Sequence, residues 1–133
     1  MTTNKQTFSD FDISFRRNPV SGDLLRLNTE QSIKQSVRNL VLINFYEKHF
    51  RPRIGNFAAG SLFELADDNN ILRSVKRSIR DLLTRFEPRI QLDDIEVSTD
   101  DQLDANKISI KIFYKIIGIL GQQTTELKMQ RVR

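Results

Sequence analysis

Five carboxylates near the expected helix ends are the side chains best placed to do chemistry: Glu47, Glu64, Asp67, Asp68 and Glu87. A glycosidase needs two carboxyl groups about 5–10 Å apart. Nothing in the spacing of these five residues demands such a pair, and carboxylates near helix starts ordinarily act as caps. We therefore expect no catalytic residue, and a hydrolase remains an alternative function.

The rest of the chain offers little for covalent or metal chemistry. It contains no cysteine, which excludes disulfides, thiol nucleophiles and zinc–thiolate sites. Its one histidine, His49, excludes a multi-histidine metal centre within one chain and is expected to be structural. The acidic stretch from Asp100 to Asp104 lacks the glycine and the glutamate of a calcium loop. We predict no metal and no cofactor.

Charge is distributed in blocks, although the net charge is only +4. Residues 70–89 carry six basic and two acidic groups, residues 90–106 carry six acidic groups and no basic group, and residues 107–133 carry six basic groups and one acidic group. Such blocks fit a surface that meets several partners better than a uniformly basic nucleic-acid binder. The cations on one face of the second long helix are Arg73, Lys76, Arg77, Arg80 and Arg85. Since no aromatic residues are interleaved with them, we rank a protein partner first, a solvated face second and a nucleic-acid-associated module third, and we expect no nucleic acid among the partners.

The length of 133 residues is enough for one domain with a hydrophobic core. No apolar run approaches the ~20 residues that cross a bilayer, and the first ten residues lack the pattern of a secretory signal. We therefore expect an intracellular or particle-bound protein without a membrane partner.

Two amphipathic helices must position these side chains. The apolar spacing after Asn28 or Thr29 predicts a helix that runs to about residue 45. Ser61 is expected to cap a short helical piece over residues 62–66. A second long helix is predicted from a cap in residues 68–70 to Phe86, where Pro88 ends it.

Three strands are predicted after this helix. The first runs from Ile90 to Val97, and its alternation slips by one residue, which indicates a bulge at Asp93-Asp94. The second, residues 107–116, has isoleucine or tyrosine at every second position from Ile108 to Ile116, and its other side carries Lys107, Ser109, Lys111 and Lys115. An acidic hairpin loop over residues 100–106 precedes it. The third begins near Thr124. The predicted fold is α+β: two amphipathic helices packed on an antiparallel meander of about three strands.

The first 27 residues carry three phenylalanines with little periodicity and are expected to form an N-terminal arm. Residues 28–133 would form the main domain. Residues 124–129 would be the terminal strand of a small open sheet, and an unpaired sheet edge is a template for strand addition.

Several motifs resemble those of a known family. Glu87-Pro88-Arg89, which ends an amphipathic helix and opens an isoleucine-rich strand, resembles the Glu-Pro-Arg motif of the small baseplate wedge proteins of contractile tails. The loop Arg51-Pro52-Arg53-Ile54-Gly55, followed by Ser61-Leu62-Phe63-Glu64, looks like a second motif of that family, and residues 32–37 resemble its opening helix. The resemblance covers roughly residues 28–129 and is to the sheath-initiator (lysozyme-like wedge) family of T4-type phages, which type VI secretion baseplates share.

The resemblance implies a non-enzymatic structural subunit of the virion tail baseplate that is assembled in the host cytoplasm. In this family the sheet resembles the handshake domain of the sheath protein and offers a strand edge to sheath arms. The Glu-Pro-Arg element is implied to bind the helical core bundle of the larger wedge proteins, and tail-tube or hub proteins are further candidate partners. A peptidoglycan hydrolase of the baseplate is the alternative.

Two sets of partner-binding residues follow from the resemblance. Those implied to contact the core bundle are Glu87, Pro88, Arg89, Arg51, Pro52 and Gly55. Those implied to form the sheath-contacting edge are Thr124, Thr125, Glu126, Leu127, Lys128 and Met129. The charges of Glu87 and Arg89 are expected to point outward, toward a partner that pairs with them.

Overall fold

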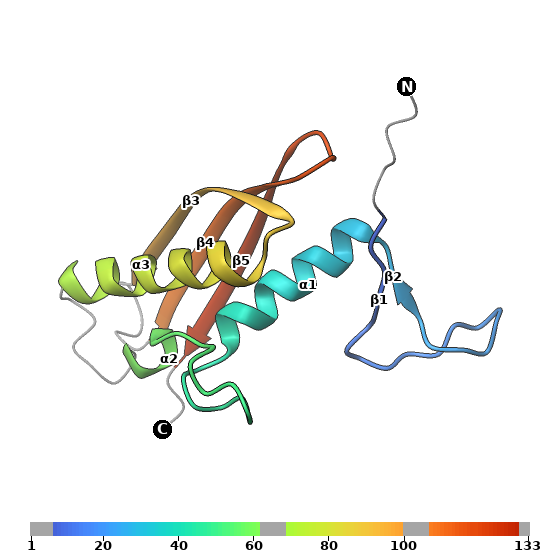
Figure 1. Cartoon of the computed structure of the whole chain (residues 1–133), viewed down its shortest axis with the longest axis horizontal. Coiled ribbons are helices and arrows are strands. Elements are labelled where there is room, and N and C mark those ends of the chain that lie inside the picture. Colours follow the sequence, from blue (N-terminus) through green and yellow to red (C-terminus); the bar gives the residue numbers. More distant parts are fainter. Residues whose placement is uncertain (1–6, 62–68, 100–106, 131–133) are drawn as a thin grey trace.

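The computed structural model describes residues 7–61, 69–99 and 107–130. Helices α1 and α3 pack on one face of a three-stranded sheet, and a small N-terminal hairpin lies beyond α1 (Figure 1). This two-layer arrangement is the predicted α+β fold.

Both long helices begin close to where the pattern predicts. Helix α1 spans Thr29–Leu42, and the side chain of its cap Asn28 accepts a hydrogen bond of 2.9 Å from the Gln31 N–H. It ends about three residues earlier than predicted, because Ile43 adopts an extended conformation. Helix α3 spans Asn69–Phe86 and ends just before the Pro88 stop.

The short helix differs from the prediction. Helix α2 spans Ala58–Ser61, so Ser61 lies within a helix instead of capping one. The buried side chain of Asn56 accepts from the Ala58 N–H at 2.8 Å and satisfies a donor at the helix start. The helical piece predicted over residues 62–66 lies outside the described residues, as does the hairpin loop over residues 100–106.

The main sheet is an antiparallel meander with strand order β3-β4-β5. Its strands are β3 (Ile90–Thr99), β4 (Lys107–Ile116) and β5 (Gln122–Gln130). The register shifts between Leu92 and Asp94, which confirms the predicted bulge. Because β4 pairs on both sides, β3 and β5 are the two edges of this sheet.

The core lies between the helices and the inner face of the sheet. Alternate residues of β4 (Ile108, Ile110, Ile112, Tyr114 and Ile116) are buried, as their period of two requires. They pack against the apolar stripes of α1 and α3. The Tyr114 hydroxyl lies 3.1 Å from the hydroxyl of Thr125 on β5, so each buried hydroxyl has a hydrogen-bonding partner.

The N-terminal segment, predicted to be an arm, contains a short β-hairpin. Strand β1 (Asp10–Phe11) pairs with β2 (Arg26–Leu27), and an isolated bridge joins Arg17 to Leu24. The hairpin is attached to the start of α1, where the Phe8 N–H donates to the Thr29 hydroxyl at 3.2 Å. It therefore forms part of the folded unit.

Candidate partner-binding surfaces

The Glu87-Pro88-Arg89 motif forms an internal cluster. The Glu87 side chain is only 2% exposed and accepts hydrogen bonds from Arg89 at 2.5 and 2.7 Å and from the Ser36 hydroxyl of α1 at 2.5 Å. The expectation that both charges point outward is wrong for Glu87. Proline at position 88 places Glu87 and Arg89 on either side of the bend, where the guanidinium can bind both carboxylate oxygens.

The electrostatics of this cluster favour the ionised form of Glu87. Burial opposes ionisation, but the hydrogen bonds from Arg89 and Ser36 outweigh it and lower the pKa of Glu87 below its ordinary value of 4.5. Arg89 remains partly exposed, with 27% of its side chain accessible, and its guanidinium lies 5.0 Å from the centre of the Phe8 ring. Of this motif, Pro88 is exposed and Arg89 is half-buried, so these two residues reach the surface and Glu87 does not.

The loop between α1 and α2 is closed tightly at its base. The Asn56 N–H donates to the Ile43 carbonyl at 3.1 Å, and the Asn56 amide donates to the Val41 carbonyl at 2.7 Å. A Cβ atom at Gly55 would lie 2.5 Å from the Asn44 carbonyl carbon. Only glycine permits this close approach, so Gly55 has a structural role in shaping the loop.

The same loop presents aromatic rings to solvent. Tyr46 is 83% exposed and Phe50 is fully exposed, and both adopt left-handed backbone conformations with φ of 69° and 67°. Aromatic residues with positive φ are strained, and such strain gathers at functional sites. Sequence reasoning missed these two residues, although aromatic side chains in a stretch without periodicity were a usable signal.

The residues predicted to bind the core bundle do not form one continuous patch. Arg51 and Pro52 lie at the exposed tip of the loop. Gly55 lines a hollow of about 200 Å³ with Phe86, the last residue of α3. Arg89 instead contacts Phe8 of the N-terminal segment.

The predicted sheath-contacting residues all lie on β5, at one edge of the sheet. Thr125 and Leu127 point into the core, whereas Thr124, Glu126 and Lys128 are exposed. The edge has backbone groups available for pairing because no described strand lies beyond β5.

A groove of about 850 Å³ runs along this edge. One wall is β5, the floor is the exposed side of α1, and the far wall is the N-terminal hairpin. The residues that line it are Ile13, Leu27, Gln31, Lys34, Gln35, Arg38, Asn39, Leu42, Thr124, Thr125 and Glu126.

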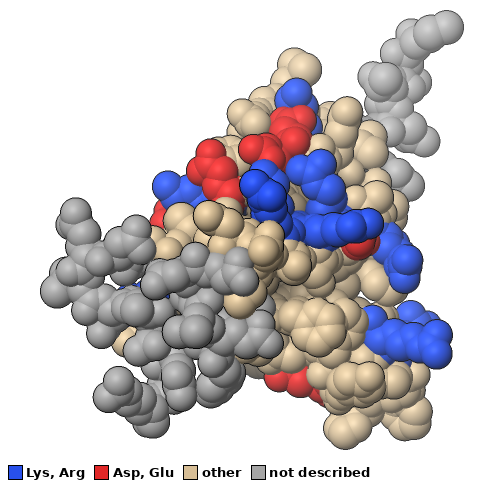
Figure 2. Space-filling view, turned by 90° about the vertical axis from the view of Figure 1, so that its left-hand side faces the viewer, with Lys and Arg blue, Asp and Glu red and all other residues tan. Residues whose placement is uncertain are grey.

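The basic face of α3 is partly neutralised by the neighbouring strand. Asp94 of β3 lies 3.0 Å from the Lys76 ammonium and 3.6 Å from the Arg80 guanidinium. Figure 2 shows basic and acidic side chains next to each other on this side of the molecule. Such a mixed surface lacks the uniform positive potential of a nucleic-acid binder.

Metal and membrane features are not found in the part of the chain that the structure describes. Its acidic and histidine side chains form no group of three or more that could hold a metal ion. None of its helices combines the length and apolar character needed to cross a membrane.

Comparison with known proteins gives one family and a shared fold. The model of the family Baseplate wedge protein gp25 matches residues 27–119. A component of the anti-feeding prophage baseplate, solved by cryo-EM, superimposes with a TM-score of 0.71 at 22% identity over 85% of this chain and 88% of that chain. A protein from Geobacter sulfurreducens, assigned as a tail lysozyme, superimposes with a TM-score of 0.66 at 19% identity over 78% of this chain and 92% of that one. No curated protein matches the sequence.

Proposed function

The chain belongs to the gp25 family of baseplate wedge proteins, and from this premise we propose that it initiates the sheath of a contractile tail by pairing the free edge of β5 with a strand of the sheath protein. Its structural role in the tail baseplate follows from the family. The proposal that this chain initiates the sheath rests on the position of β5 at the edge of the sheet, where a groove beside the strand leaves room for a further strand.

Strand addition at this edge gives hydrogen-bonding partners to backbone groups that pair with no described strand. An added strand would continue the β3-β4-β5 meander as a fourth strand. Exposed Lys128 and Glu126, which lie 3.7 Å apart, are charged side chains of the kind that keep an open edge from pairing indiscriminately. The edge is therefore suited to one partner strand rather than to aggregation.

We assign binding of the wedge core bundle to the loop that contains Arg51 and Pro52. Exposed Tyr46 and Phe50 give this loop the large aromatic surface that interface centres use. Glu87 supports the domain from within, because its carboxylate is already paired. Arg89 contributes only through its exposed part.

Proline substitutions test strand addition directly. Backbone N–H groups of successive strand residues point to opposite edges, so either Lys128 or Met129 donates toward the free edge. One of the two variants, Lys128→Pro or Met129→Pro, removes the outward donor and leaves the β4–β5 hydrogen bonds intact. It should support wedge assembly, while tails assembled with it carry complete baseplates and naked tubes. If that variant is Lys128→Pro it should also keep the wild-type thermal melt, because Lys128 is exposed, whereas Met129 packs against the core. The variant that removes the inward donor should melt earlier by the equivalent of ~1–3 kcal/mol. Normal sheaths with both variants would contradict the proposal.

A peptidoglycan hydrolase is the second candidate function, because one structural neighbour is assigned as a tail lysozyme. The described residues argue against it. Hydrogen bonds from Asn44 lower the pKa of Glu47, and the pKa of Glu87 is lowered as well, whereas a general acid needs a raised pKa. Purified protein should show no peptidoglycan hydrolysis above background. Turnover that is lost in Glu64→Gln or Glu87→Gln would make the enzyme the better account.

A further inference from the structure

The groove beside β5 is lined by residues from three parts of the fold: β5, α1 and the N-terminal hairpin. Thr124 to Glu126 of β5 form one side, the polar surface of α1 forms the floor, and Ile13 and Leu27 of the N-terminal hairpin form the other side. The hairpin residues up to position 26 precede the range that matches the gp25 family. Most of this wall is thus formed by residues outside the range that the family model matches.

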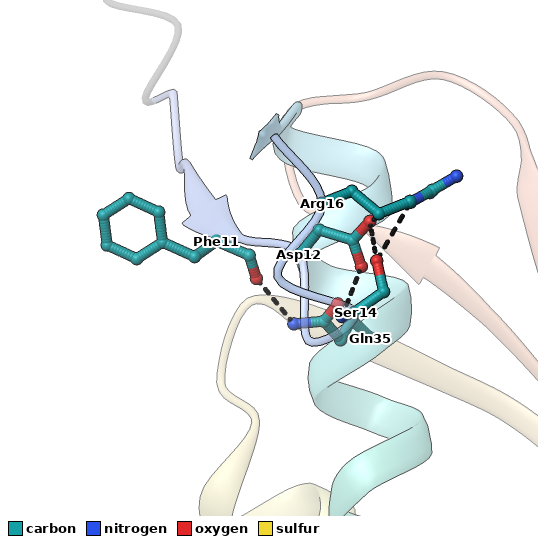
Figure 3. A network of polar contacts seen from close by, with 5 residues as sticks. All are labelled: Phe11, Asp12, Ser14, Arg16 and Gln35. Carbon is teal, nitrogen blue, oxygen red and sulfur yellow. Dashed lines mark hydrogen bonds and ion pairs between the residues drawn. The ribbon is translucent and has the colours of Figure 1, made fainter. Parts of the chain in front are cut away.

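The hairpin is fixed to α1 well enough to act as a wall. The Gln35 side chain of α1 donates to the Phe11 carbonyl at 3.1 Å (Figure 3). The adjoining turn is held by Asp12, which accepts hydrogen bonds from Ser14 and Arg16. These bonds lower the pKa of Asp12 to about 2, so the turn keeps its charge pairing throughout the neutral range.

The floor of the groove carries positive charges that have no ion-pair partner among the described residues. Lys34 and Arg38 lie one helical turn apart on α1, line the groove and are exposed. Neither has an ion-pair partner among the described residues. Apolar surface surrounds these cations, since Ile13 is 54% exposed and Leu42 is 41% exposed. The acidic residue among those that line the groove, Glu126, lies on the β5 wall, with its carboxylate 3.7 Å from the Lys128 ammonium. An occupant that complements the basic floor carries acidic side chains between apolar ones.

We propose that this groove selects the strand that pairs with β5, and that the N-terminal hairpin clamps the strand from the other side. This inference rests on the proposed strand addition. The occupant is an extended segment of the sheath protein whose side chains alternate between the two faces of the strand. On the face toward α1 it presents an acidic residue to Lys34 and Arg38 and apolar residues to Ile13 and Leu42. Backbone pairing holds the strand, and the groove decides which strand is held.

Binding of the purified sheath protein of the same particle tests the groove. The double variant Lys34→Glu/Arg38→Glu should bind about tenfold more weakly, because it places like charges across the interface. The matched control is Arg73→Glu/Arg77→Glu, an equally spaced exposed pair on α3 outside the groove, which should bind as the wild type does.

A second pair of variants tests the clamp. Ile13→Ser should weaken binding about fivefold by removing apolar contact. Val20→Ser is its control, because Val20 is 93% exposed on the same hairpin and does not line the groove. Thermal melts of all variants should match the wild type, since each substituted side chain is exposed.

The outcomes separate the groove from strand addition itself. If the outward-facing proline variant of β5 loses binding while the groove variants bind normally, strand addition stands and the groove proposal is overturned. If the wild-type chain does not bind the sheath protein, or if both proline variants bind it normally, the proposed function fails and the groove proposal fails with it. If the groove variants change only the self-association of the chain, the occupant is a second copy and the proposal is wrong.

Discussion

Replacing Glu87 by glutamine should destabilise the isolated domain at neutral pH. The substitution keeps the shape of the side chain but removes the charge that binds Arg89 through two hydrogen bonds and Ser36 through a third. Breaking a buried ion pair costs ~3–5 kcal/mol, and the loss should be smaller here because Arg89 is 27% exposed and can regain water. We expect a loss of about 2–3 kcal/mol, which lies within the ~1.5–3 kcal/mol range for a hydrogen bond to a charged group. In a domain of this size it lowers Tm by roughly 6–15 °C.

The destabilisation should depend on pH in a defined direction. The folded-state pKa of Glu87 lies below its ordinary value of 4.5, so the ionised pair contributes its full stability above pH 4.5 and loses it as the pH falls through the folded-state pKa. The difference in free energy of unfolding between wild type and Glu87→Gln should therefore be largest near pH 7 and shrink below pH 4.5.

Urea denaturation at several pH values measures this difference. Glu126→Gln is a suitable control, because Glu126 is exposed and its contact with Lys128 is 3.7 Å long. It should change the free energy of unfolding by less than ~0.5 kcal/mol. The reasoning would be refuted if Glu87→Gln were as stable as the wild type at pH 7, or if its deficit stayed the same down to pH 3.

Three further predictions concern the loop and the sheet. Gly55→Ala should destabilise the fold by at least ~2 kcal/mol in urea denaturation, since its Cβ would meet backbone atoms at 2.5 Å; Gly60→Ala, with no atom within 4 Å, should be neutral or stabilising. The double variant Tyr46→Ser/Phe50→Ser should melt within about 2 °C of the wild type, because substitutions of exposed side chains usually change stability by less than ~0.5 kcal/mol. It should nevertheless fail to assemble with the wedge proteins. Normal wedge assembly would show that the loop is not part of the interface. Tyr114→Phe should lower the free energy of unfolding by ~1–2 kcal/mol, because it leaves the buried Thr125 hydroxyl without its partner. A variant as stable as the wild type would show that this hydrogen bond contributes nothing.

Regular elements with a strong pattern were predictable from the chain itself. Helix α3 combines an apolar stripe with a proline stop, and β4 alternates over all ten residues, so the predicted bounds of both agree with the structure to within a few residues. The bulge in β3 was predictable for the same reason, because a one-residue slip in alternation has few other causes.

Features that depend on distant contacts were not predictable in this way. Glu87 is buried because Ser36, 51 residues earlier in the chain, completes its hydrogen bonds, and no local pattern reveals that pairing. The early start of α2 depends on the Asn56 side chain, which also bonds to carbonyl groups at the end of α1. The exposed rings of the loop and the wall formed by the hairpin likewise follow from how separate segments pack.

A cryo-EM map of the assembled tail end tests the central claim most directly. It should show a strand of the first sheath ring paired along β5 as a fourth strand of the β3-β4-β5 sheet, lying between β5 and the N-terminal hairpin. A map in which the edge of β5 contacts only solvent, while the sheath is attached elsewhere on the chain, would contradict the account.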